Sequence, residues 1–134
     1  MITCLAVAHL GIRVSDAARA IAFYEKLGFR FLWQGGPEPV AILENVAGVE
    51  VNLIVNASPA ETPVNVLMDI PEKHPGYTHV ALSVASMEET VAELGRLGVP
   101  ITGGPMELGG RLSLFVRDPD RNVVELREAR PSGA

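Results

Sequence analysis

The stretch HLGIRVSDAARAIAFYEKLGF (9–29) decides the fold, because the chain repeats it as HVALSVASMEETVAELGRLGV (79–99). The two stretches align without a gap, so that His79 takes the place of His9 and Gly98 takes the place of Gly28. Self-similarity at a fixed spacing is typical of a duplicated supersecondary unit. The alignment therefore predicts that the chain is built from two copies of one module.

Each copy has the pattern of a strand, a helix and a terminating glycine. Apolar side chains recur on one face of 17–27 and again on one face of 87–97, as expected for helices that pack on a sheet. Ser15 or Asp16 is the expected cap of the first helix, and Ser86 is the expected cap of the second. A glycine follows each helix, where a left-handed residue commonly ends it.

Three short β-rich runs, separated by turn residues, follow each helix. These runs are 29–34, 39–45 and 48–56 in the first copy and 99–108, 111–117 and 122–128 in the second. The pattern predicts an α+β fold of paired βαβββ modules with mixed sheets. We expect a single domain over 1–134, with repeat modules at about 5–56 and 76–128. The proline-rich segment 57–75 is the expected linker.

Composition restricts the partners and the compartment. The formal charge of −5 and the pI near 5.1 argue against nucleic-acid binding, which needs a basic face. The single cysteine, Cys4, excludes an intrachain disulfide, and we expect it to be a small buried side chain. The amino-terminal residues lack a basic signal region, and no apolar run is long enough to cross a bilayer. We therefore expect a cytoplasmic protein with a small-molecule partner.

Side chains alternate across a strand, so each predicted strand has an apolar face and a second face of different character. Small residues at Gly11, Ala81 and Ser83 leave room on the second face, which predicts a concave surface that holds a ligand. The residues on this face include His9, Arg13, Asn52, Asn56, His79, Ser113, Phe115 and Glu125. Of these, we expect Ser113 and Phe115 to contact the substrate.

The repeat also predicts a metal site. His9 and His79 are equivalent positions in the two modules, and Glu125 on the last strand of the second module has Asn52 as its equivalent. Two imidazoles and one carboxylate on a shared face can bind one Zn²⁺, Ni²⁺, Mn²⁺ or Fe²⁺ ion and leave positions open. The predicted metal ligands are His9, His79 and Glu125, and Asn52 is a candidate fourth ligand.

The motifs HLGIRVSD, AIAFYEKLGFR, GYTHVALSV and FVRDPDRNVVEL resemble those of the vicinal oxygen chelate superfamily. This superfamily includes glyoxalase I, extradiol dioxygenases, and bleomycin and fosfomycin resistance proteins. The resemblance implies the glyoxalase/bleomycin resistance/dioxygenase-like fold, in which paired modules curl their sheets into a cup around one divalent metal ion. It also implies a homodimer, and it carries the family's metal positions over to His9, His79 and Glu125.

The resemblance to glyoxalase I extends to substrate-binding and catalytic positions. Arg13 and Asn56 match positions that hold glutathione, and Glu125 matches the metal-linked base. Asn52, however, stands where glyoxalase I has a glutamate ligand, and an amide cannot move a proton. Extradiol dioxygenases have a tyrosine where this chain has Phe115.

Three hypotheses for the function follow from these features. The first is a metal-dependent lyase or isomerase of glyoxalase type, acting on a small oxygen-bearing metabolite with Glu125 as the proton shuttle. The second is an Fe(II)-dependent ring-cleaving dioxygenase. The third is a metal-free protein that binds an antibiotic and thereby confers resistance. The first hypothesis makes the chain an enzyme, and it is the one that the residues favour.

Overall fold

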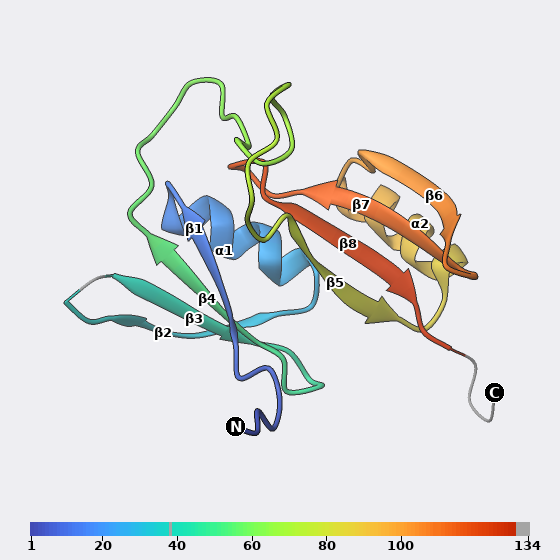
Figure 1. The fold of residues 1–134 in the computed structure, drawn as a ribbon, viewed down its shortest axis with the longest axis horizontal. Helices are drawn as coiled ribbons and strands as arrows, with labels where there is room; N and C mark the ends of the chain where they lie inside the picture. Colours follow the sequence, from blue (N-terminus) through green and yellow to red (C-terminus); the bar gives the residue numbers. More distant parts are fainter. Residues whose placement is uncertain (38, 131–134) are drawn as a thin grey trace. The chain divides into compact units, whose positions relative to one another are not determined.

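The computed structural model describes residues 1–37 and 39–130. It divides into two compact units, Met1–Thr62 and Pro63–Ala134, and each unit contains one copy of the repeat (Figure 1). The division lies inside the predicted linker, where residues 56–78 form turns and bends without a helix or strand.

The first unit has the order strand, helix, strand, strand, strand. Its elements are β1 (Leu10–Val14), α1 (Ala17–Lys26), β2 (Arg30–Gly35), β3 (Val40–Glu44) and β4 (Glu50–Val55). The strands form one mixed sheet in the order β1-β4-β3-β2. β1 runs parallel to β4, and the other neighbours are antiparallel. A parallel pair needs a crossover connection, and α1 begins this connection.

The second unit repeats the same topology. Its elements are β5 (His79–Val84), α2 (Met87–Leu97), β6 (Gly103–Leu108), β7 (Arg111–Arg117) and β8 (Val123–Glu128). The sheet order is β5-β8-β7-β6, with β5 parallel to β8. The prediction of an α+β fold built from paired βαβββ modules with mixed sheets is confirmed.

The core of each unit lies between its helix and one face of its sheet. In the first unit, Tyr24 of α1 is almost fully buried and makes edge-on ring contacts with Phe23 and Phe29. Leu43 of β3 and Leu53 of β4 are fully buried in the same unit. The fully buried apolar strand residues of the second unit include Leu114 and Val116 of β7. The apolar strand faces are therefore the ones that the alternation predicted.

The helix ends follow the predicted capping chemistry. The Asp16 carboxylate accepts a hydrogen bond from the Arg19 N–H at 2.8 Å, so that Asp16 rather than Ser15 is the cap of α1. The Ser86 hydroxyl accepts from the Glu89 N–H at 3.2 Å at the start of α2. Gly98 ends α2 with a φ of 70°, a conformation that side chains disfavour.

The amino-terminal segment differs from expectation. Residues 1–9 form no strand, and Cys4 is exposed rather than buried. The expectation was wrong because β1 begins only at Leu10, so the apolar residues before it do not enter the sheet. Among the described residues, no helix is long and apolar enough to span a membrane.

Candidate metal and proton-transfer site

Strand register in the second unit places the predicted residues on one open face, opposite to the apolar core. His79 begins β5, and Glu125 on β8 is the partner of Ala81 on β5. On its other side, Glu125 is the partner of Phe115 on β7. Paired residues in neighbouring strands point to the same side of a sheet. His79, Glu125 and Phe115 therefore share the open face.

His79 and Glu125 are in direct contact. The His79 Nε2 lies 3.0 Å from the Glu125 Oε1, and the Thr78 hydroxyl lies 2.8 Å from the His79 Nδ1 on the other side of the ring. The Phe115 ring makes an edge-on contact with the imidazole, with 5.8 Å between the ring centroids. The His79 side chain is 32% exposed, whereas the Glu125 side chain is 9% exposed. A ligand can thus reach the imidazole, and Glu125 lies largely below the surface.

Ser113 holds the second oxygen of this carboxylate. It is fully buried, and its hydroxyl donates to the Glu125 Oε2 at 2.8 Å. The Arg127 Nη1 in turn donates to the Ser113 hydroxyl at 3.2 Å, and the Arg127 Nη2 donates to the Leu108 carbonyl at 2.6 Å. Buried carboxylates require such partners, because an unpaired buried charge is costly. The sequence placed Ser113 on the correct face, but this contact with Glu125 was not predicted.

Two of the predicted metal ligands, His9 and Asn52, lie in the first unit. The His9 Nδ1 lies 3.7 Å from the Glu50 Oε2, just before β1. The Asn52 Oδ1 on β4 is buried without a hydrogen-bond partner in the described part of the chain. An orphaned buried oxygen is uncommon, and a cation or a ligand donor would satisfy it.

Arg13 and Asn56, the predicted substrate-binding pair, lie together in the first unit. The Arg13 Nε donates to the Asn56 Oδ1 at 2.9 Å across the β1–β4 side of the sheet. This bond fixes the position of the guanidinium relative to Asn56. The pair has the geometry of a preorganised site for a polar group of a ligand.

The donor set fits a divalent metal ion, although no single unit contains all of it. His79 offers an imidazole whose other nitrogen is in contact with the Thr78 hydroxyl, which fixes the orientation of the ring. Glu125 offers a carboxylate next to it. Across residues 1–37 and 39–130, no group of three or more His, Cys, Asp and Glu side chains is gathered closely enough to hold a metal. The three-ligand site therefore remains a prediction.

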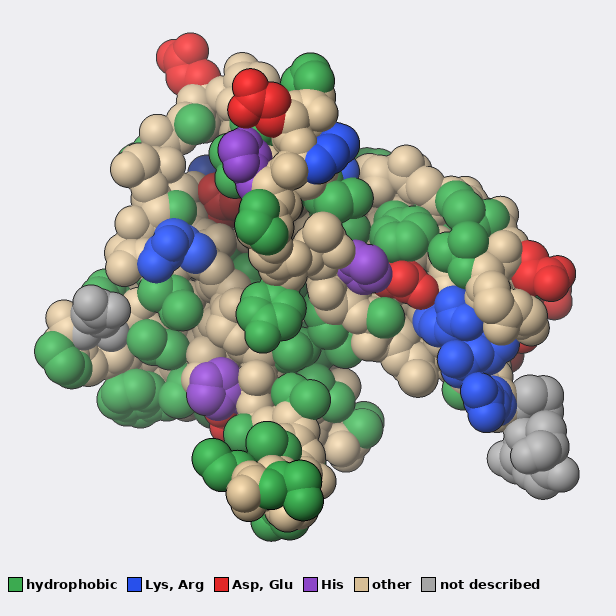
Figure 2. Space-filling view, viewed as in Figure 1, with side chains coloured by type: hydrophobic (Ala, Val, Ile, Leu, Met, Phe, Trp, Pro, Cys, Tyr) green, Lys and Arg blue, Asp and Glu red, His purple; other side chains and the backbone are tan. Residues whose placement is uncertain are grey.

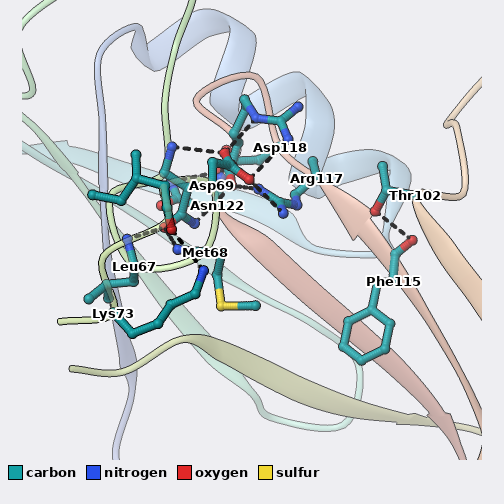
Figure 3. Close-up of polar contacts among 12 residues, drawn as sticks. Leu67, Met68, Asp69, Lys73, Thr102, Phe115, Arg117, Asp118 and Asn122 are labelled. Carbon is teal, nitrogen blue, oxygen red and sulfur yellow. Dashed lines mark hydrogen bonds and ion pairs between the residues drawn. The ribbon is translucent and has the colours of Figure 1, made fainter. Parts of the chain in front are cut away.

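A cluster of charged residues in the second unit was missed by the sequence reasoning. This Asp69 cluster consists of Asn65, Asp69, Arg117 and Arg121. Figure 3 labels Asp69 and Arg117 among these residues. The Arg121 Nε donates to the Asp69 Oδ2 at 2.7 Å, and the Arg117 Nη2 lies 3.0 Å from the Asp69 Oδ1. The Asn65 N–H also donates to Asp69, and the Asn65 side-chain amide donates to the Arg121 carbonyl. The cluster ties the segment after Pro63 to the β7–β8 turn.

The same contacts set the electrostatics of Asp69. The hydrogen bond from Arg121 is the main cause that holds the pKa of the Asp69 carboxyl well below its ordinary value of 3.8. The bonds from Asn65 and Arg117 act in the same direction, and partial burial opposes them. Asp69 is therefore ionised at all physiological pH values.

The fold and the polar open faces define a class of small α+β proteins made from two βαβββ modules. A family model, the Glyoxalase/Bleomycin resistance protein/Dioxygenase superfamily, matches residues 6–126. The chain belongs to this superfamily, as its motifs indicated.

Similar proteins include two bacterial enzymes. The chain is 33% identical over 130 residues to lactoylglutathione lyase from Salmonella typhimurium and 34% identical over 130 residues to lactoylglutathione lyase from Escherichia coli O157:H7. Each alignment covers 93% of this chain and 93% of the relative. A crystal structure of a glyoxylase/bleomycin resistance protein/dioxygenase domain from Frankia sp. EAN1pec has a TM-score of 0.76 at 22% identity. It covers 96% of this chain and 100% of that one.

Proposed function

We propose that the chain is a divalent-metal-dependent lyase or isomerase of glyoxalase type that acts on a small oxygen-bearing metabolite. The observation that carries the proposal is the environment of Glu125. One oxygen of this largely buried carboxylate faces His79, and the other is held by Ser113. The likeness to two lactoylglutathione lyases over nearly their whole length supports the same class of reaction.

The residues that would hold the metal are His79 and Glu125 of the second unit with His9 of the first, and Asn52 as a candidate fourth. The orphaned Asn52 oxygen and the hydroxyl support of His79 favour this set. When bound, a divalent ion supplies Lewis-acid polarisation of substrate oxygens. The ion would be Zn²⁺, Ni²⁺, Mn²⁺ or Fe²⁺, because imidazole and carboxylate ligands suit all four.

Glu125 is the group that moves the proton. A carboxylate can take a proton from one carbon of the substrate and return it to the adjacent carbon, so the reaction needs no external donor. Ser113 keeps one carboxylate oxygen fixed, and the other, which lies 3.0 Å from the His79 Nε2, is the one that would take up the proton. Because Asn52 cannot accept a proton, this chain has one such base where glyoxalase I has two acidic residues.

Substrate binding is assigned to Arg13, Asn56 and Phe115, whereas Ser113, the fourth residue that the sequence predicted, has an indirect role. The hydrogen-bonded Arg13–Asn56 pair is suited to a polar tail, such as that of a thiol conjugate or a carboxylate. Phe115 contributes an apolar wall beside His79. Ser113 acts through Glu125, because its own side chain is fully buried.

We further propose that the active form is a homodimer, in which both units contribute to each site. Superfamily membership supports this assembly. The exposed apolar side chains of the amino-terminal segment, which include Ile2, Leu5 and Val7, are consistent with a surface that is covered in the assembly.

The decisive experiment combines metal supply with turnover. Metal-free protein is supplied separately with Ni²⁺, Zn²⁺, Mn²⁺ and Fe²⁺ and assayed for formation of lactoylglutathione, the compound in the relatives' name, from glutathione and the parent 2-oxoaldehyde. At least one metal should activate, and Glu125→Gln at saturating metal should lower turnover by at least about a hundredfold. Glu107→Gln, which removes an exposed carboxylate of β6 in the same unit, is the matched control and should retain turnover.

Two other outcomes would replace the proposal. Oxygen uptake that requires Fe²⁺ would identify a dioxygenase, the second hypothesis from the sequence. Failure to retain any of the four metals, with tight binding of an antibiotic such as bleomycin, would identify a binding protein. The superfamily includes members of both kinds by its own description.

A further inference from the structure

A group of three arginines occupies one end of the second unit's open face. Arg111 begins β7, Arg127 lies on β8, and Arg130 follows β8. Ser113 is the register partner of Arg127, and Arg111 lies two residues before Ser113 on the same strand. Arg111 and Arg127 therefore point to the same side of the sheet as Glu125. Figure 2 shows Lys and Arg side chains gathered in one blue patch on this unit.

The charge of this arginine group is poorly balanced by the protein. Glu125 lies 3.7 Å from the Arg127 Nη1, and its charge opposes the lowering of the Arg111 pKa. Partial desolvation and repulsion from Arg127 and Arg130 both lower the pKa of the Arg111 guanidinium. No described carboxylate forms an ion pair with Arg111 or Arg130 within 4.0 Å. Such an excess of positive charge is unusual in a chain with a net charge of −5.

Arg127 is the anchored member of the group. Its two terminal nitrogens are engaged by Ser113 and by the Leu108 carbonyl, so its position is fixed by the protein. Arg111 and Arg130 have their donors available to a ligand. A guanidinium presents paired N–H groups that match the oxygens of a carboxylate or a phosphate.

We propose that Arg111, Arg127 and Arg130 form a binding site for an oxyanion group of the substrate. Residues two apart on one strand face are about 7 Å apart, which is the separation of Arg127 from Glu125 along β8. The anionic group would therefore lie a few bonds from the carbon that exchanges its proton with Glu125. The inference rests on the proposed function, and it adds that the substrate carries a carboxylate or a phosphate.

The site can be tested without knowledge of the substrate. Metal-free full-length protein is titrated by calorimetry at low ionic strength with succinate, with inorganic phosphate and with chloride at matched ionic strength. Succinate or phosphate should bind more tightly than chloride, and the tighter of the two identifies the anion class. Arg111→Gln should weaken that binding by roughly tenfold, because one charge-assisted hydrogen-bond donor is lost.

Arg96→Gln is the matched control. It removes the same charge from the same unit, but Arg96 is on α2 and pairs with Glu93. Equal weakening by Arg96→Gln and Arg111→Gln would overturn the site, because it would show a diffuse charge effect. Binding of succinate and phosphate no tighter than that of chloride would also overturn it.

Two further measures keep the result interpretable. If Arg111→Gln fails to fold, Arg130→Gln takes its place, because Arg130 is exposed and follows the last strand. The titration uses neither the metal nor turnover, so its failure leaves the Glu125 experiment unaffected. Intact anion binding with no metal-dependent turnover would instead refute the proposed function and leave the anion site standing.

Discussion

At the scale of single residues, the most informative contact is the one between Ser113 and Glu125. The Ser113 hydroxyl is fully buried and donates to the Glu125 carboxylate at 2.8 Å. The Arg127 guanidinium donates to the same hydroxyl. We propose that a hydroxyl with no exposed surface acts on the substrate through the carboxylate that it holds. Its effect is to select one orientation of the base, as a supporting residue does around a metal ligand.

Ser113→Ala is predicted to lower kcat by about tenfold to a hundredfold and to leave KM within about twofold. The reason is that Glu125 keeps its identity but loses the bond that fixes its orientation. Steady-state kinetics at saturating metal separate the two parameters. Ser58→Ala, which changes an exposed serine outside both sheets, is the control. A rise in KM at unchanged kcat would instead make Ser113 a determinant of substrate binding.

At the scale of elements, the Asp69 cluster fixes the segment between the modules to the β7–β8 turn. Arg121 has a φ of 68°, a left-handed conformation that is rare for a side chain other than glycine. Its guanidinium binds Asp69, and its carbonyl accepts from Asn65 and from Arg117. The contacts at both ends of Arg121 offset the unfavourable backbone conformation.

Asp69→Asn is predicted to destabilise the protein by about 1–2 kcal/mol near pH 7. Because the folded-state pKa of Asp69 is below 3.8, this contribution is present above about pH 4 and is lost as the pH falls below that value. Urea unfolding of both proteins between pH 3 and pH 7 measures the difference. The difference in free energy of unfolding should begin to shrink below about pH 4 and should be smaller at pH 3 than at pH 7.

The control for this experiment is Glu93→Gln, which breaks an exposed ion pair with Arg96 on α2. Exposed pairs contribute little, so this variant should unfold at nearly the wild-type urea concentration throughout. A difference between wild type and Asp69→Asn that stayed constant down to pH 3 would refute the electrostatic explanation.

The elements also show why sequence predicted some features and not others. The repeat of His9 by His79, the capping residue Ser86 and the apolar alternation in β7 are local patterns, and the structure contains the elements that they predict. Asp69 lies in an irregular segment and contacts Arg117 and Arg121, which are about fifty positions later in the chain. No periodicity marks such contacts, because turns and bends have no repeating geometry.

The sequence likewise predicted some features of the candidate site and missed others. Alternation predicted which face carries Ser113 and Glu125, but it could not predict that both would be buried on that face. Burial there follows from the neighbours across the sheet, which depend on register between β5, β8 and β7. Cys4 illustrates the opposite error, since an apolar sequence alone did not bring it into a strand.

At the scale of the whole molecule, the proposed metal set draws on residues from both units. His9 belongs to Met1–Thr62, whereas His79 and Glu125 belong to Pro63–Ala134. In a homodimer, the two histidines of one site can come from one chain or from two. Mixing of inactive variants distinguishes these arrangements.

His9→Ala and His79→Ala are each predicted to lose metal-dependent turnover. If each site combines His9 of one protomer with His79 of its partner, unfolding and refolding the variants together should restore about a quarter of wild-type turnover. The mixed dimer then contains one intact site and one that lacks both histidines. Refolding each variant alone is the control. No recovery from the mixture, with dimers confirmed by light scattering, would place both histidines of a site in the same chain.

The division at Thr62 has a consequence for synthesis in the cell. Every strand of the first sheet comes from one continuous stretch, so this unit can fold while the ribosome is still translating the rest. During that interval the nascent chain presents β1 and β2 as sheet edges, and β2 carries exposed Phe31, Leu32 and Trp33. Open edges of this kind favour aggregation. We therefore expect these two edges to be the places where the first half is most prone to misassembly.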